Sequence, residues 1–406
     1  MKIEKIKVEN FKGIDYLEFK PKMMNILIGR NNTCKTSILQ AIDFTHNNYK
    51  FMVNNIEYPT KLINFNSKKT EIQMELSDEK KEKLLLKRPD EIILRKDINN
   101  KILLVLEQIM NDFLTSKKSD ISKSKIKEKI KRISQELTKK EIISELIIDS
   151  VLVRYNTEEN IYYLISSKKL RKILKPLFKD IGLEIPLGIF EVYFEEGLNN
   201  ISLYNKENQK KIKFLEENSK VFYIGILNSY FEFIKDEKDK IKIQKIQEII
   251  KKYDLVENLE RFDWDAIVFN SKQGRKQIPY EFMGDGFKKM VELLAVFNLK
   301  NIENKVLLLE EPNSFMHPGY TRELIKLMLN LSKVMNVQLF ITTHNFDLIE
   351  GFFNEESLSK KEVNYLKKEL LILRTSKNKD IFVPKLIKYK DAVMESKEIF
   401  MDLRGL

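Results

Sequence analysis

The segment Gly29–Ser37, with the sequence GRNNTCKTS, restricts the fold of this chain more than any other stretch. A short apolar run, Asn25–Ile28, precedes it, and Ser37–Phe44 follows with helical periodicity. A strand, a tight turn and a helix start in this order are typical of a phosphate-binding loop, in which backbone N–H groups and the helix dipole surround the phosphates. A chance Lys-Thr-Ser sequence at a helix start is the alternative.

Individual residues of this loop have expected roles. Lys35 is placed to reach the β- and γ-phosphates, and Thr36 to offer its hydroxyl to Mg²⁺. Cys34 replaces the second glycine of the motif, and a thiol at a helix start is expected to be reactive because the dipole favours the thiolate. The predicted nucleotide-binding set is Gly29, Arg30, Asn31, Asn32, Thr33, Cys34, Lys35, Thr36 and Ser37.

Two carboxylates follow a second apolar run near the C-terminus. Val306–Leu309 leads into Glu310-Glu311-Pro312. Carboxylates at a strand end beside a phosphate loop suit metal coordination and activation of water, so Glu310 is the predicted metal ligand and Glu311 the general base. The alternative is an ordinary charged strand end.

Two further segments complete the set of motifs. Val337–Asn345 reads as a strand that ends in His344, a residue placed to contact the γ-phosphate and orient the attacking water. Met283–Lys289 reads as a glycine turn before a helix, where Gly284 and Gly286 let backbone amides approach an anion. A structural histidine and an ordinary glycine turn are the alternatives.

Hydrophobic patterning predicts how these motifs are assembled. In the C-terminal third, helices and strands alternate, which favours a parallel sheet flanked by helices: Ala266–Asn270, Phe287–Leu299, Val306–Leu309, Thr321–Met335 and Gln338–Thr342. Short strands near the N-terminus indicate a mixed sheet beside the nucleotide site: Lys2–Val8, Glu71–Leu76, Glu91–Leu94 and Ile102–Leu106.

The middle of the chain carries no motif. An apolar stripe within Ser119–Ser150 predicts an amphipathic helix, and the interleaved charges of Asp78–Arg88 are typical of a helix surface. We therefore predict three parts, namely residues 1–106 as the N-terminal part of an ATPase head, 107–260 as a helical insertion and accessory region, and 261–406 as the C-terminal part of the head.

Composition restricts the partners and the compartment. The net charge of +12 favours DNA as a partner, because clustered lysines neutralise phosphates and release counterions. Lysines spread over solvated faces are the alternative. The single cysteine excludes an intrachain disulfide. Apolar runs are too short to cross a bilayer and the N-terminus lacks a signal peptide, so we expect a cytoplasmic protein with no membrane partner.

The order and spacing of these motifs resemble the SMC/RecF-like branch of ABC ATPases, in particular compact OLD-like AAA-type ATPases without a Toprim domain. Glu9–Ile14 corresponds to the family's Asn-Phe-Arg element, with Lys12 in place of arginine. Gly284–Lys289 corresponds to the signature, Glu310–Pro318 to the Glu-Glu-Pro block with departures at Asn313 and Met316, and Thr342–Asn345 to the histidine switch. Residues 1–45 and 264–406 carry the match.

The resemblance implies an α/β fold of the ABC type, with ATP and Mg²⁺ bound between two copies of the chain. In that arrangement Gly284, Gly286 and Lys288 complete the site of a second copy, and Lys12 contacts the phosphates. The protein would be a homodimer or higher oligomer. It would act on DNA, or gate a separately encoded nuclease, in genome maintenance or in defence against phage and plasmids.

Two other functions stay open. One is a nucleotide-binding scaffold with degraded catalysis, which Cys34, Gly284 and Asn313 make conceivable, and the other is a transport-type ABC ATPase. Gln73 and Gln108 are candidates for the glutamine that senses the γ-phosphate in relatives. Because only residues 345–406 follow the histidine switch, the chain is expected not to cut DNA by itself.

Overall fold

The computed structural model describes most of the two parts predicted to form the head. The described residues are 1–48, 50, 59–88, 150–156, 161–165, 218–225, 240–252, 258–263, 265–271, 274–299, 302–314, 316–354 and 356–395, with isolated positions between 128 and 215. The predicted strands Glu91–Leu94 and Ile102–Leu106, and most of the predicted helix within Ser119–Ser150, lie outside them. No helix in the described part is long and apolar enough to cross a membrane.

The first sheet is antiparallel throughout and has the strand order β2-β1-β4-β5-β6-β7. It consists of β1 (Ile3–Phe11), β2 (Ile14–Phe19), β4 (Lys69–Leu76), β5 (Lys81–Lys87), β6 (Ser150–Tyr155) and β7 (Ile161–Ile165). The expectation of a helix surface over Asp78–Arg88 is wrong, because β5 runs through it. Glu82, Leu84 and Leu86 are buried at every second position, which is the period of a strand.

The second sheet forms the centre of the molecule, with the order β15-β14-β3-β13-β12-β8. Its strands are β3 (Met24–Ile28), β8 (Val221–Ile224), β12 (Val306–Glu310), β13 (Gln338–Thr343), β14 (Leu370–Asn378) and β15 (Ile381–Lys388). All are parallel except β15, which pairs antiparallel with β14 at one edge. The middle strands β3 and β13 are buried along their whole length, because both faces of the sheet are covered. The predicted parallel core is confirmed.

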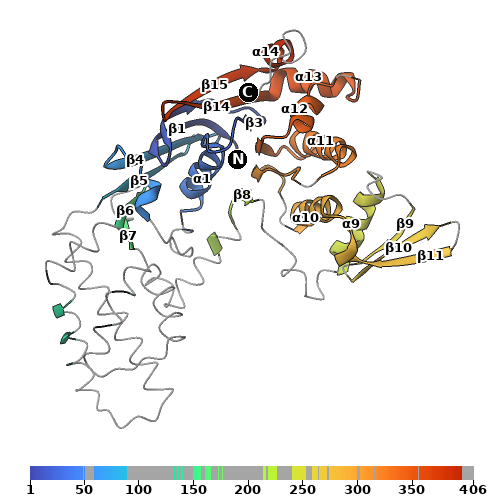
Figure 1. The fold of residues 1–406 in the computed structure, drawn as a ribbon, viewed down its shortest axis with the longest axis horizontal. Coiled ribbons are helices and arrows are strands. Elements are labelled where there is room, and N and C mark those ends of the chain that lie inside the picture. Colours follow the sequence, from blue (N-terminus) through green and yellow to red (C-terminus); the bar gives the residue numbers. More distant parts are fainter. Residues whose placement is uncertain are drawn as a thin grey trace.

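Helices cover the two faces of the central sheet unequally (Figure 1). On one face, α1 (Lys35–His46) packs with the antiparallel sheet against residues such as Leu308 and Phe340. The other face, which includes Leu307 and Leu339, is covered by α10 (Asp285–Leu299), α11 (Pro318–Lys333), α12 (Phe346–Gly351), α13 (Lys360–Glu369) and α14 (Tyr389–Val393).

A third, smaller sheet is antiparallel with the order β11-β10-β9. It contains β9 (Leu259–Phe262), β10 (Ala266–Ser271) and β11 (Gly274–Pro279), next to α9 (Lys240–Lys252). The strand predicted at Ala266–Asn270 therefore exists, but it belongs to this sheet and not to the parallel core. The short 3₁₀ helices η1 (Pro59–Leu62) and η4 (Tyr280–Phe282) complete the described elements.

The segment 107–260 contributes strands to both large sheets. β6 and β7 extend the antiparallel sheet, and β8 forms an edge of the central sheet. The boundaries proposed at residues 106 and 260 therefore do not coincide with the limits of these sheets. We still propose a helical insertion, but it can comprise only those residues of 107–260 that lie between these strands.

Candidate active site

Three residues of the phosphate-binding loop, Gly29, Asn32 with φ 62° and Cys34, have backbone conformations that favour glycine. Gly29 has φ +148°, and a Cβ there would lie 2.2 Å from the carbonyl oxygen of Thr375, so no other residue fits without rearrangement. Cys34 has φ 71° in the left-handed region and is the N-cap of α1. The cysteine therefore adopts the turn that the motif's second glycine normally provides.

The first turn of α1 leaves backbone donors available. Within the described part of the chain, the N–H groups of Lys35, Thr36 and Ser37 have no hydrogen-bond acceptor. Thr33 holds the loop, since its hydroxyl donates to the Arg30 carbonyl at 2.7 Å and contacts the Thr375 hydroxyl at 2.8 Å. Open N–H groups at a helix N-terminus fit phosphate oxygens, so the geometry of this loop is compatible with the predicted phosphate site, which stays a prediction.

Lys35 is buried under the same loop. Its Nζ donates to the carbonyl oxygens of Gly29 at 2.8 Å and Arg30 at 2.9 Å. Burial lowers the pKa of Lys35, while the nearby carboxylates of Glu311 and Glu310 act in the opposite direction. The cation is therefore held by the loop carbonyls, and the carboxylates of the predicted general base Glu311 and the predicted metal ligand Glu310 favour its charged form.

Glu310 contacts the phosphate-binding loop directly. It is the last residue of β12, and its Oε1 accepts a hydrogen bond from the hydroxyl of Thr36. Its Oε2 accepts one from the hydroxyl of Tyr223, on the neighbouring strand β8. A hydroxyl and a carboxylate oxygen are ligands that Mg²⁺ accepts, so Thr36 and Glu310 fit the predicted metal site. No group of three or more His, Cys, Asp or Glu side chains arranged for a metal occurs among the described residues.

Glu311 and His344 form a pair at the ends of neighbouring strands. His344 Nδ1 lies 2.9 Å from Glu311 Oε1, and the His344 backbone N–H donates to Glu311 Oε2 at 3.2 Å. The Glu311 N–H in turn donates to the Thr342 carbonyl at 3.0 Å. Glu311 has φ 46°, a left-handed conformation that is strained for a glutamate.

Lys12 lies on the same side of the site. Burial lowers its pKa, and the nearby carboxylate of Glu310 acts in the opposite direction. Its Nζ donates to the side-chain oxygen of Gln40 on α1. Lys12 thus contacts the helix that follows the loop, and its contact with the phosphates stays a prediction.

The expectation of a reactive Cys34 thiol needs correction. The side chain is half-buried, and this burial raises the pKa of the thiol. Lys377 and Lys12 act to lower it, but their effect is smaller. Desolvation therefore opposes the effect of the helix dipole that motivated the expectation.

The signature residues lie apart from this site. Phe287 and Met290 of α10 pack on the face of the central sheet opposite to the face covered by α1. Gly284 is exposed, and no atom of the described residues lies within 4 Å of where its Cβ would be. Gly286 is buried, and Lys288 Nζ donates to the Glu281 carbonyl at 2.7 Å. Within one chain these residues are not brought to the loop.

Sequence reasoning missed two residues that contact the site. Thr375 and Tyr223 lie on β14 and β8, neither of which carries a recognisable motif, so no local signal could have found them. Asn313, a departure from the family pattern, is buried and accepts a hydrogen bond from the Thr343 hydroxyl at 3.2 Å. Gln73 donates to Glu71 within the antiparallel sheet, and Gln108 lies outside the described residues.

Comparison with known proteins identifies relatives of this chain. A family model for the AAA ATPase domain matches residues 1–349. Endonuclease GajA of Bacillus cereus is 26% identical over 90% of this chain and 60% of its own length. The uncharacterized protein MJ1542 of Methanocaldococcus jannaschii is 22% identical over 53% of this chain and 26% of its own length. The chain thus spans less than two thirds of either relative.

Solved SMC head domains align over almost the entire chain. The SMC head domain from Thermotoga maritima covers 96% of this chain and all of its own, with 12% identity and a TM-score of 0.40. The SMC head domain with a coiled coil and joint from Pyrococcus yayanosii covers 98% of this chain and 99% of its own, with 12% identity and a TM-score of 0.44. These scores are too low to support any argument about function.

Proposed function

This chain belongs to the AAA ATPase domain family and is an ATPase. We propose that it is of the SMC/RecF-like ABC type and hydrolyses ATP at sites formed between two copies of itself. The observation that carries the proposal is the position of the signature. Gly284 is exposed on the face of the sheet that α1 does not cover. An exposed glycine before a helix suits close approach to an anion. A second copy is the partner that would supply the phosphates.

The described geometry supports definite roles in this reaction. The open N–H groups at the start of α1, together with Lys35 and Lys12, bind the phosphates. Thr36 and Glu310 would hold Mg²⁺, and the bound ion would neutralise phosphate charge. Glu311 takes a proton from the attacking water, and His344, now paired with Glu311, orients that water at the γ-phosphate.

Two features of the chain point to a biological role that involves DNA. A net charge of +12 supports DNA as a partner, and the similarity to Endonuclease GajA supports a connection with a nuclease. From these two features we propose a role in genome maintenance or defence. The nuclease activity of that relative does not transfer directly, because this chain spans 60% of its length.

Trapping the dimer tests the central proposal. Glu311→Gln removes the base but keeps the nucleotide site, so this variant should form a dimer with Mg²⁺ and ATP that light scattering detects. Adding Gly284→Gln should prevent this dimer, because the side chain fills the space that the phosphates of the second copy need. Glu356→Gln, at another exposed position, is the matched control and should dimerise normally. A Gly284→Gln variant that dimerises as well as the control would contradict the proposal.

Turnover measurements distinguish an active ATPase from a nucleotide-binding scaffold with degraded catalysis. Steady-state ATP hydrolysis by the wild-type protein that is lost in Glu311→Gln supports the proposed ATPase mechanism. ATP-dependent dimerisation of the wild-type protein with no such turnover would favour the scaffold.

A further inference from the structure

Tyr223 is a polar residue beside the candidate metal site to which the proposed ATPase mechanism assigns no role. It lies on β8, at the edge of the central sheet next to β12. From its contacts we propose that Tyr223 is a positioning residue that occupies one oxygen of Glu310 and leaves the other as a single, monodentate ligand for the divalent cation. This inference rests on the proposed assignment of Glu310 to Mg²⁺.

The two oxygens of Glu310 have different partners. The Tyr223 hydroxyl donates to Oε2, and the Thr36 hydroxyl donates to Oε1. Thr36 is itself a proposed metal ligand, so the oxygen that it contacts is the one facing the metal position. The phenol therefore holds the carboxylate by the oxygen on the other side.

Tyr223 is suited to act only as a hydrogen-bond donor to the carboxylate. Its side chain packs beside the core that also contains α1. Burial, followed by the contact with Glu310, raises the pKa of the phenol, so the hydroxyl stays protonated over the physiological range. A protonated phenol beside a carboxylate must donate its hydrogen bond, which keeps Oε2 occupied.

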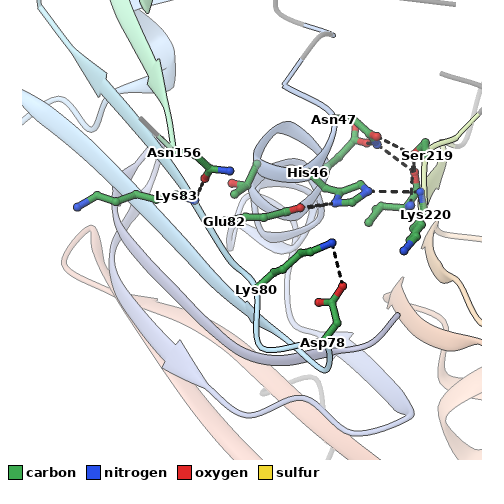
Figure 2. Close-up of polar contacts among 12 residues, drawn as sticks. His46, Asn47, Asp78, Lys80, Glu82, Lys83, Asn156, Ser219 and Lys220 are labelled. Carbon is green, nitrogen blue, oxygen red and sulfur yellow. Dashed lines mark hydrogen bonds and ion pairs between the residues drawn. The ribbon is translucent and has the colours of Figure 1, made fainter. Parts of the chain in front are cut away.

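A second set of contacts fixes β8 relative to the phosphate-binding helix. At the C-terminal end of α1, Asn47 accepts a hydrogen bond from the Ser219 hydroxyl at 2.7 Å (Figure 2). Asn47 also donates to the Val221 carbonyl at 3.0 Å. His46 Nε2 accepts from the Lys220 N–H at 3.3 Å, as Figure 2 also shows.

The same histidine connects a third element. His46 Nδ1 lies 2.9 Å from Glu82 of β5, so one side chain links α1, β5 and the residue before β8 (Figure 2). Both ends of α1 are therefore tied to β8, at Thr36 through Glu310 and Tyr223, and at His46 and Asn47 through residues 219–221. This double connection fixes the position from which Tyr223 reaches Glu310.

A Glu310 carboxylate with one oxygen hydrogen-bonded to Tyr223 discriminates between divalent cations. Mg²⁺ requires octahedral geometry with few protein ligands and retains several waters, so one carboxylate oxygen is sufficient. Ca²⁺ takes six to eight ligands and readily binds carboxylates through both oxygens. With Oε2 held by Tyr223, Glu310 offers Ca²⁺ only one oxygen, and the site favours Mg²⁺.

Cation titrations of nucleotide binding test this role without measuring turnover. In the full chain, binding of fluorescent N-methylanthraniloyl-ADP is followed against Mg²⁺ and, separately, against Ca²⁺. Tyr223→Phe should raise the half-saturating Mg²⁺ concentration on the order of tenfold, because an outer-shell partner of a metal ligand is lost. The half-saturating Ca²⁺ concentration should stay unchanged or fall, because the second oxygen becomes available.

Control variants separate this role from the metal assignment and from folding. Tyr365→Phe removes a half-buried phenol whose hydroxyl contacts Ser332 at 2.7 Å, and it should change neither titration. Glu310→Gln should weaken both cations, and if it has no effect the metal assignment itself fails. If Glu310→Gln weakens both but Tyr223→Phe changes neither, or weakens both equally, the role of Tyr223 is overturned. Melting curves verify folding, and Tyr223→Leu serves as a second variant without the hydroxyl.

Discussion

At the residue scale, the side chain of Cys34 requires a glycine at position 13. Cys34 occupies a left-handed position at the start of α1, and its side chain extends toward the turn between β1 and β2. A Cβ added at Gly13 would lie 2.8 Å from Cys34 Sγ, closer than such contacts normally occur. The side chain that replaces the motif's glycine in the loop therefore requires a glycine across from it.

We expect Gly13→Ala to destabilise the wild-type protein by about 1 kcal/mol, the lower end of the cost of overpacking a filled site. In a Cys34→Gly background the same substitution should be almost without cost, because the sulfur is absent. Chemical denaturation of the two single variants and the double variant gives the coupling free energy. An equal cost in both backgrounds would show that the two residues are independent.

At the scale of elements, β14 is the strand that supports the phosphate-binding loop. It lies parallel to β3, and Thr375 reaches the loop from it. The Thr375 hydroxyl contacts the Thr33 hydroxyl at 2.8 Å and donates to the Ile28 carbonyl at 3.1 Å. Its carbonyl lies against Gly29. A strand far along the chain thus determines the shape of a loop near the N-terminus.

Thr375→Val keeps the shape of the side chain but removes these hydrogen bonds. We expect nucleotide affinity to fall by about 1 kcal/mol, or roughly fivefold, because the loop loses a support that a neutral hydrogen bond of this size provides. Equilibrium binding of a fluorescent nucleotide measures the loss. Thr45→Val is the matched control, since it removes a buried hydroxyl bonded to the Ala41 carbonyl within α1. Equal losses in the two variants would mean that the effect is not specific to β14.

At the scale of the whole molecule, the central sheet separates the two halves of the proposed site. The loop, Glu310 and Glu311 lie with α1, whereas the signature begins a helix on the opposite face. Dimerisation around ATP would therefore join faces that one chain keeps apart, and it would also bring together the positive charge of two chains.

The net charge leads to a prediction about DNA. We expect ATP to strengthen binding to duplex DNA of arbitrary sequence, and the logarithm of affinity to fall roughly linearly with the logarithm of salt concentration. Fluorescence anisotropy over a range of salt concentrations measures the slope. Lys35→Ala is the control, because it should lose the ATP effect but keep any basal association. No association at low salt would rule out DNA as a partner of the isolated protein.

The sequence by itself predicted the parallel core, and it predicted that the loop Gly29–Ser37, the two carboxylates after β12 and His344 follow the ends of strands. These features depend on local order, since each motif consists of adjacent residues at the end of one strand. Tertiary structure alone decided which residues complete the site. Tyr223 and Thr375 reach it because β8 and β14 are neighbours of β12 and β3 in the sheet, and strand order across a sheet leaves no periodic mark in the sequence. The strand at β5 was hidden for a related reason, because its alternating lysines and glutamates resemble a helix surface until the antiparallel sheet buries one side of it.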